Sequence, residues 1–143
     1  MAALEDATYK STKPFAFETT VRAKVVKVYD GDTCTCVFDT FGLGLFRHQI
    51  RLSGVDTPEL KSKNPDEKAA AILVRDFVAG LILGKIVDLK CEGSDKYGRI
   101  LGTITVQAMP EAPAICINTL LVEKKMARSY DGGTKQEFAK AEA

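Results

Sequence analysis

The sequence predicts an α+β protein in which five β-strands form a barrel and three α-helices pack around it. Three observations predict this class. Alternating and β-branched residues dominate positions 19–54, a helical period replaces them over 64–83, and two more strand-like segments follow within 85–107. With 143 residues the chain can bury a core of its own. We therefore expect one domain over residues 17–143, preceded by a tail or short leading segment over residues 1–16.

Three predicted strands, joined by two short turns, make up the first half of this domain. The stretch TTVRAKVVKVYD ends at Asp30, the turn DGD follows, and TCTCVFDT continues the chain in the opposite direction. The segment TFGLG then reverses the chain again before LFRHQIRLSGV. Apolar and polar residues alternate in this third strand, which places Arg51 on the face opposite the apolar row.

The stretch NPDEKAAAILVRDFVAGLILG predicts the clearest helix. Asn64 can cap its start, Pro65 suits the first helical position, and Gly84 ends it after Leu83. Apolar residues recur at helical spacing and predict one broad buried stripe. The stripe consists of Ala69, Leu73, Phe77 and Leu81, beside Ala70, Val74 and Val78.

Two strands and two short helices are expected in the remaining sequence. KIVDLKCEG and GRILGTITVQ read as strands joined by a polar loop. Asn118 can cap a helix through about Ala127, and TKQE at 134–137 has the spacing of a capping box for a last helix. Five strands with a helix between the third and fourth is the order of an OB-type Greek-key barrel, which often handles nucleic acids and sugars.

Composition and charge limit the classes of protein that fit. Twenty Lys and Arg against nineteen Asp and Glu give a net charge of +1, so any phosphate-binding surface must be local. The chain shows neither a membrane-spanning apolar run nor a secretory signal, so we expect an intracellular protein, unless a leader was trimmed. The four cysteines lack zinc-site spacing and are expected to pack as small apolar residues.

Carboxylates stand at two of the predicted strand ends. Asp30 and Asp32 flank Gly31, while Asp56 and Glu59 follow the third strand, and oxygen ligands of this kind suit hard cations such as Ca²⁺. Taken singly, each motif has a simpler reading. Asp-Gly is most often only a turn, and Asp-Thr-Pro ends strands without further function.

Basic side chains accompany these carboxylates. Arg51 precedes Asp56 by five residues, and Arg99 opens another strand after a loop that holds Lys96 and Tyr97. Guanidinium groups match phosphate oxygens, and they stabilise the charge that develops on a phosphoryl group during attack. The single histidine, His48, falls on the apolar row and is expected to have no role, so a base is sought in a carboxylate or a metal-bound water.

Three stretches in fixed order carry a resemblance to a known family. VYDGDT, IRLSGVDTPE and DKYGR, with a helix between the second and third, resemble the signature stretches of staphylococcal nuclease-like domains over about residues 19–140. The resemblance implies a five-stranded OB barrel with three helices. It also implies a Ca²⁺-dependent phosphodiesterase that cuts DNA and RNA and leaves 5′-hydroxyl and 3′-phosphate ends.

The resemblance also assigns the acidic residues. Asp32 and Asp56 match the calcium ligands of the family, together with the Thr57 carbonyl, and Asp30 matches a position just outside the ion. Glu59 matches the residue that positions or deprotonates the attacking water. In the DTPE turn, Pro58 stiffens the connection between the metal ligand and this carboxylate.

The basic positions are assigned in the same way. Arg51 and Arg99 match the two arginines that hold the scissile phosphate and stabilise the five-coordinate transition state. Lys96 and Tyr97 match positions that hold a terminal nucleotide phosphate. The family's base-stacking aromatic residues have no clear match after Ala127, and the nearly neutral charge predicts modest nonspecific affinity, which favours short or single-stranded substrates.

A binding module is the main alternative to an enzyme. Related domains in Tudor-containing multi-repeat proteins have lost catalytic residues and hold nucleic acid or protein instead. All the matched positions are filled here, which favours a nuclease. No membrane and no obligate protein partner is indicated, and we expect a monomer.

Overall fold

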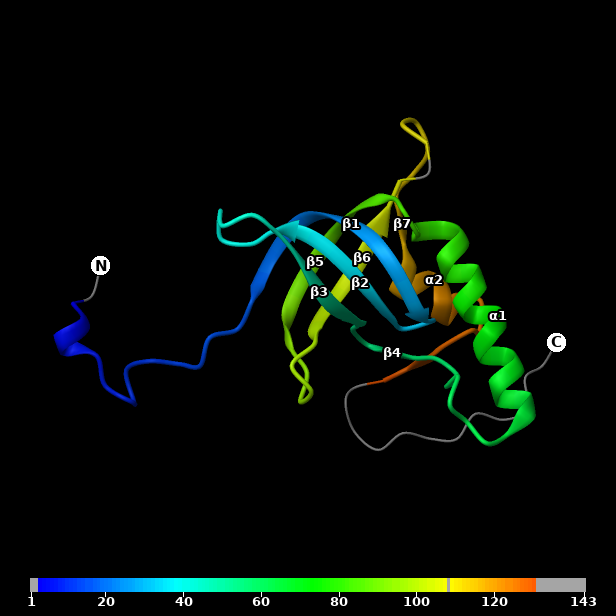
Figure 1. Cartoon of the computed structure of the whole chain (residues 1–143), viewed down its shortest axis with the longest axis horizontal. Helices are drawn as coiled ribbons and strands as arrows, with labels where there is room; N and C mark the ends of the chain where they lie inside the picture. Colours follow the sequence, from blue (N-terminus) through cyan, green and yellow to red (C-terminus); the bar gives the residue numbers. More distant parts are fainter. Residues whose placement is uncertain (1–2, 108, 131–143) are drawn as a thin grey trace.

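The computed structural model describes residues 3–107 and 109–130. Its centre is a closed barrel of five long strands: β1 (Glu18–Asp30), β2 (Thr33–Asp39), β3 (Leu45–Leu52), β5 (Ile86–Ser94) and β6 (Ile100–Val106). Neighbours in the order β3-β2-β1-β5-β6 pair antiparallel, and a parallel pairing between β3 and β6 closes the barrel (Figure 1). The predicted five-stranded OB-fold Greek-key barrel is confirmed.

The barrel interior is filled by alternate residues of each strand. Val25 of β1, Cys36 of β2 and Ile50 of β3 are fully buried, as are Leu89 of β5 and Ile104 of β6. All four cysteines are free thiols, and Cys34, Cys36 and Cys91 lie in this core, as expected for small apolar side chains.

The long helix α1 (Pro65–Ile82) packs against β1, on the outside of the barrel (Figure 1). Its start is as predicted, since the Asn64 side chain accepts hydrogen bonds from the amides of Asp66 and Glu67. The predicted stripe is partly wrong, because Ala69 is exposed and Leu73 is 69% exposed. The fully buried positions of the helix are Ala71, Val74, Val78 and Ile82.

The cause of this error lies in the sequence. The run AAAILV places apolar side chains all around one stretch of the helix, so periodicity alone does not select the face that contacts the barrel. The contact with β1 selects it instead. Phe77 and Leu81, at the edge of the buried stripe, are partly buried and do pack against the core.

The second helix, α2 (Ile117–Glu123), lies against β6. Asn118 is not its N-cap, which is Cys116; instead the Asn118 side chain accepts from the Ile104 amide and donates to the carbonyls of Ser53 and Gly102. A buried amide that bonds three backbone groups, in β6 and after β3, satisfies more polar groups than one cap. The third predicted helix, at 134–137, lies outside the described residues.

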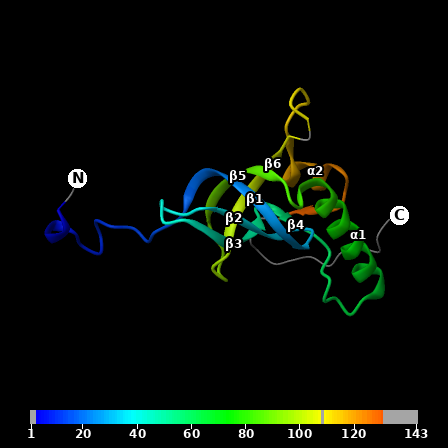
Figure 2. The same ribbon diagram turned by 45° about the horizontal axis from the view of Figure 1, so that its top comes forward.

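Three two-residue strands complete the fold. β7 (Ile115–Cys116) extends the sheet beside β6, while β4 (Val55–Asp56) pairs with β8 (Arg128–Ser129). The β4–β8 ribbon crosses beside the end of β3 (Figures 1 and 2). It places Asp56 opposite Arg128 and fixes the chain that follows the third barrel strand.

The segment before β1 extends away from the barrel in both views (Figures 1 and 2). It holds a short 3₁₀ turn, η1 (Leu4–Asp6), and ends at Phe17, whose ring stacks on Phe38 with a centroid separation of 5.7 Å. No helix in the described ranges is both long enough and apolar enough to cross a membrane.

Candidate active site

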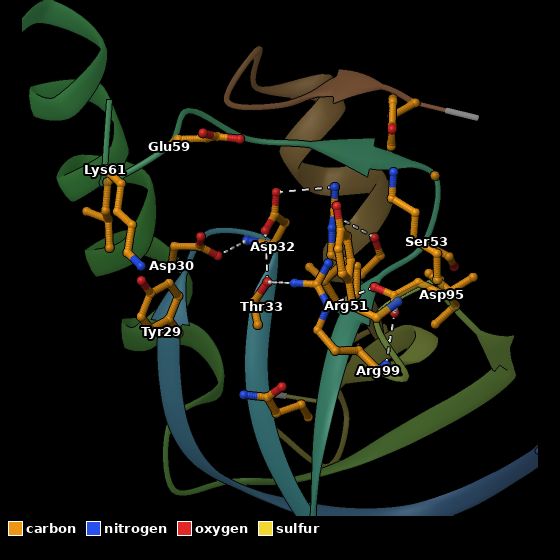
Figure 3. Close-up of a pocket in the computed structure, with 18 residues that line it drawn as sticks. Tyr29, Asp30, Asp32, Thr33, Arg51, Ser53, Glu59, Lys61, Asp95 and Arg99 are labelled. Carbon is orange, nitrogen blue, oxygen red and sulfur yellow. Dashed lines mark hydrogen bonds and ion pairs between the residues drawn. The ribbon is translucent and has the colours of Figure 1, made fainter. Parts of the chain in front are cut away.

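A pocket of about 1050 Å³ opens where the β1–β2 turn, the end of β3 and the β5–β6 loop meet (Figure 3). Its volume suits a nucleotide-sized ligand. Seven residues that the sequence singled out line this pocket: Asp30, Asp32, Arg51, Glu59, Lys96, Tyr97 and Arg99. The other two, Asp56 and Thr57, are buried and contact Arg51 and Asp32. The fold therefore gathers all nine residues in one place.

The β1–β2 turn supplies the first two carboxylates. Asp30 ends β1, and its Oδ1 accepts a hydrogen bond from the Asp32 amide at 3.1 Å. Gly31 lies between them, and a Cβ at this position would be 2.5 Å from Val74 of α1 and 3.0 Å from the Thr57 side chain. Only glycine lets the turn lie this close to both segments.

Arg51 projects away from the barrel interior, as the alternation of β3 predicts, yet its side chain is only 8% exposed. The chain after β3 folds back over it. Nη1 donates to the carbonyl oxygens of Leu52 at 2.9 Å and Val55 at 2.8 Å. Nη2 lies 3.5 Å from carboxylate oxygens of both Asp32 and Asp56, and has no hydrogen-bond partner among the described residues.

Thr57 ties the two acidic segments together. Its amide donates to Asp32 Oδ2 at 3.1 Å, although the two residues are 25 positions apart. The side chain is almost fully buried, and in the part of the chain that the structure describes Oγ1 has no hydrogen-bond partner. Asp32 also accepts from the Thr33 hydroxyl at 3.0 Å.

Glu59 follows on the exposed stretch between β4 and α1. Its amide donates to Glu67 Oε2 at 3.0 Å, so the first turn of α1 holds the backbone of this stretch. In Figure 3 Glu59, Asp30 and Lys61 lie on one side of Asp32, and Arg51 and Arg99 lie on the other. The carboxylates and the guanidinium groups thus flank the same opening.

The loop between β5 and β6 carries the remaining residues, and Asp95 organises it. Asp95 Oδ1 accepts from the amides of Tyr97 and Arg99, both at 2.9 Å, and Oδ2 accepts from Arg99 Nε at 2.7 Å. Gly98 has a φ of +82°, which the tight turn requires. Lys96 Nζ and Arg99 Cζ lie 5.2 and 5.4 Å from the centre of the exposed Tyr97 ring.

Burial and charge set the protonation of the two turn carboxylates. Burial, followed by the negative charge of Asp32, raises the pKa of Asp30 to about 7. Burial also acts to raise the pKa of Asp32, but the Arg51 guanidinium and hydrogen bonds from Asp30 and Thr57 outweigh it. The pKa of Asp32 therefore lies below its ordinary value. Asp32 is ionised at neutral pH, and Asp30 is near its midpoint.

The model of the family described as staphylococcal nuclease homologue matches residues 49–143 of this chain. The chain belongs to this family. It is also 31% identical over 114 residues to Protein ParB of Escherichia coli, a match that covers 77% of this chain and 58% of the relative. It is 33% identical over 107 residues to an uncharacterized endonuclease of Haemophilus influenzae, with 75% and 51% covered. The chain thus spans just over half the length of these relatives.

The family match includes Arg51, Asp56, Glu59 and Arg99, while Asp30 and Asp32 precede it. The staphylococcal nuclease resemblance implies a calcium ion, and the donor set here fits one. Asp32 and Asp56 bring carboxylate oxygens to the same guanidinium, so two hard anionic donors lie close together. Within residues 3–107 and 109–130 no cluster of three or more acidic, His or Cys side chains suits a metal, so a bound ion would need carbonyl or water oxygens beside these two carboxylates.

Sequence reasoning missed several residues that build this nuclease-family site. Asp95 positions Arg99, Glu67 holds the Glu59 backbone, and Asn118 links Ser53 to Gly102. Asp95 had a usable signal, because an aspartate that opens a polar turn commonly accepts amides two residues on. Glu67 and Asn118 act across tertiary contacts, for which no local pattern exists.

Two tyrosines at the pocket were also not assigned. Tyr29 is the extra residue of a β-bulge between Val28 and Asp30, and it is 44% exposed at the pocket wall. Bulges next to binding sites commonly redirect a side chain in this way. The Tyr130 ring centre lies 5.9 Å from Arg51 Cζ, which puts an aromatic ring beside the guanidinium.

Proposed function

We propose that this domain is a calcium-dependent phosphodiesterase that hydrolyses DNA and RNA and leaves 5′-hydroxyl and 3′-phosphate ends. The observation that carries the proposal is the position of Arg51. Its Nη2 faces two carboxylates at 3.5 Å and has a hydrogen-bonding proton without an acceptor in the described residues. A phosphate oxygen held between the guanidinium and a cation on those carboxylates would satisfy this donor.

Arg51 and Arg99 would hold the scissile phosphate. Arg51 is fixed by two backbone carbonyls, and Arg99 is fixed by Asp95 and reaches Thr33 Oγ1 at 3.5 Å. Donors that are already in place need little rearrangement when charge develops on the phosphoryl group. The loop residues Lys96 and Tyr97 line the same pocket and would bind a neighbouring phosphate of the substrate.

Asp32, Asp56 and the Thr57 carbonyl would hold the calcium ion, with Asp30 just outside it. A bound Ca²⁺ supplies a Lewis acid that neutralises a phosphate oxygen and orients the attacking water. Asp30 hydrogen-bonds the Asp32 amide and so keeps the turn in its conformation. Glu59 would accept the proton of the water, because it is the exposed carboxylate that lines the pocket opposite the arginines.

The test is a metal series with two substrates. The purified chain is incubated with plasmid and with a single-stranded oligonucleotide, in Ca²⁺, Mg²⁺ or chelator, beside a Glu59→Gln variant. We expect cleavage with Ca²⁺, none with chelator, and a loss of at least 100-fold in Glu59→Gln, on the scale of a lost proton-transfer group. Oligonucleotide binding without cleavage in any metal would favour the non-catalytic binding module instead.

A further inference from the structure

The outer face of β1, β2 and β3 continues the candidate active site along the barrel. Residues directly opposite one another in neighbouring strands share a face. In successive rows, Arg51 of β3 pairs with Thr33 of β2, Gln49 with Thr35, and Arg47 with Val37. On the other side of β2, Thr35 pairs with Lys27 and Val37 pairs with Lys24. We call Lys24, Lys27 and Arg47 the cationic face; Gln49, between Arg47 and Arg51 on β3, belongs to the pocket lining.

Burial confirms that these rows point outward. Lys24, Lys27 and Arg47 are exposed, whereas the intervening row formed by Val25 and Cys36 is fully buried. A bulge at Val26 keeps Lys27 on the outer side, because it adds one residue to β1 between the two pairs. The cationic face is therefore a property of strand register and does not depend on side-chain rotamers.

Within the described ranges, no ion pair neutralises the charges of this face. The ion pairs in the described ranges involve Arg22, Arg51, Arg75 and Arg99, and none includes a residue of the cationic face. The acid at the far end of β2, Asp39, accepts a hydrogen bond from the Gly44 amide. A chain with a net charge of only +1 thus keeps three cations together next to its pocket, none of them in an ion pair with another described residue.

We propose that the cationic face binds the backbone of a single-stranded nucleic acid whose scissile phosphate lies in the pocket. The inference rests on the proposed function and extends it to the substrate beyond the cleaved bond. Residues two apart on one face of β3 are separated by about 6.7 Å, so Arg51, Gln49 and Arg47 present polar groups at regular steps. Lys27 and Lys24 lie across β2 in the rows of Gln49 and Arg47, so these groups form one band that leads away from the pocket and suits a single backbone.

The depth of the pocket favours a single strand over a duplex. Arg51 is only 8% exposed, so a phosphate must leave the general surface to reach it. A single strand can bend inward at one phosphate, whereas duplex backbones are held in place by pairing and stacking. Tyr29 stands where the face meets the pocket and is 44% exposed, so a base leaving the pocket can stack on it.

Binding in the absence of cleavage tests this proposal. The probe is a fluorescent single-stranded 16-mer DNA in chelator, titrated at several salt concentrations with the parental chain and with Lys24→Ala/Lys27→Ala/Arg47→Ala. Each phosphate neutralised on a single strand contributes about 0.7 to the slope of log K against log salt. We expect the slope to fall by about 2 and the affinity near 0.1 M salt to fall on the order of 100-fold.

A matched variant controls for total charge. Lys68→Ala/Arg75→Ala/Lys124→Ala removes three positive charges from α1 and the end of α2. We expect the fall in its salt slope to be less than half of the fall in the cationic-face variant. The proposal is overturned if the cationic-face variant, with an unchanged unfolding transition, retains the parental slope. It is also overturned if the control loses as much, or if the parental chain does not bind the strand.

A dinucleotide substrate separates this proposal from the proposed function. Two nucleotides occupy the pocket alone, so Ca²⁺-dependent hydrolysis of a dinucleotide should be equal in the parental chain and the cationic-face variant. If the parental chain binds the 16-mer through the face yet hydrolyses no dinucleotide, the proposed reaction fails and the binding face stands. If the variant loses dinucleotide hydrolysis as well, the residues act within the site and the proposal of an extended face is wrong.

Discussion

The two arginines of the site are held by different parts of the molecule. Arg51 is 8% exposed and lies between Asp32 of the β1–β2 turn, 19 positions earlier in the sequence, and β4, which follows four to five residues after it. Arg99 is 26% exposed and is oriented by Asp95, four residues before it in the same loop. One guanidinium is therefore buried where the β1–β2 turn meets the chain after β3, and the other is held nearer the surface, mainly by a local turn.

Because the two arginines differ in burial, their contributions to folding stability should differ even if their contributions to the reaction are alike. Arg51 satisfies two backbone carbonyls and lies between two buried carboxylates, so its loss should affect both the fold and the reaction. Arg99 lies in a surface loop, where an ion pair contributes little to stability. Substitutions at the two positions should have similar effects on rate and unequal effects on folding.

Arg51→Ala has the largest expected effect. Removal of the guanidinium leaves Asp32 and Asp56 buried without their shared cation, which should lower the free energy of unfolding by about 3–5 kcal/mol in the absence of metal. The rate of DNA cleavage should fall at least 10²-fold, as for a lost transition-state donor. Denaturant unfolding and initial rates measure the two. A rate loss below fivefold in a folded variant would contradict the assignment.

Arg99→Ala should separate the two effects. We expect a similar loss in rate, on the order of 10² to 10³, because the second donor to the phosphate is gone. The free energy of unfolding should change by less than about 1 kcal/mol, because the ion pair with Asp95 is partly exposed. A destabilisation equal to that of Arg51→Ala would show that the β5–β6 loop is as much a part of the folded core as β4.

Asp95→Asn should give an intermediate result. Asparagine keeps an oxygen for the amides of Tyr97 and Arg99 but loses the charged acceptor of Arg99 Nε. A hydrogen bond to a charged group contributes about 1.5–3 kcal/mol, so loss of this positioning should lower the rate about 10- to 100-fold. The double variant with Arg99→Ala should be no slower than Arg99→Ala alone, and an additive loss would mean that Asp95 acts independently of Arg99.

Asp30 is tested through stability alone, as a pH dependence in chelator. The folded carboxyl keeps its proton up to a pKa of about 7, whereas the unfolded one loses it near 3.8. The folded state then binds more protons between these values, so the free energy of unfolding should fall as pH rises from about 4 to 7. The lowered pKa of Asp32 makes the free energy of unfolding rise with pH, but only at pH values below the ordinary aspartate pKa of 3.8, so it does not mask this fall. Asp30→Asn should flatten the fall, and an unchanged pH profile would reject the coupling of the two carboxylates.

The sequence predicted the elements whose patterns are local. Strand alternation placed Arg51 on the outer face of β3, and Asn64 with Pro65 marked the start of α1. The same reasoning failed where contacts between distant segments decide which face is buried or which partner a side chain binds. The predicted buried face of α1 was partly wrong, because apolar residues surround one stretch of the helix. The predicted cap at Asn118 was also wrong, because its side chain bonds Ile104 and Ser53 and does not cap α2.

The candidate site shows the same division. The sequence singled out the residues that the fold gathers at one pocket, because VYDGDT, IRLSGVDTPE and DKYGR carry them in short stretches, and their roles stay predictions. The burial of Arg51 was not predicted, since the chain that covers it depends on pairing between β4 and β8, more than 70 positions apart. Nor did the sequence alone reveal the cationic face, because it requires the register of three strands and two bulges.

The most direct test of the central claim is mass spectrometry of the products from a single-stranded oligonucleotide cut in Ca²⁺, with Asp56→Asn as the comparison. The proposed reaction should yield fragments that end in 5′-hydroxyl and 3′-phosphate, and the variant, which lacks one proposed calcium ligand, should yield almost none. Fragments with 5′-phosphate ends, or undiminished cleavage by Asp56→Asn, would contradict the account.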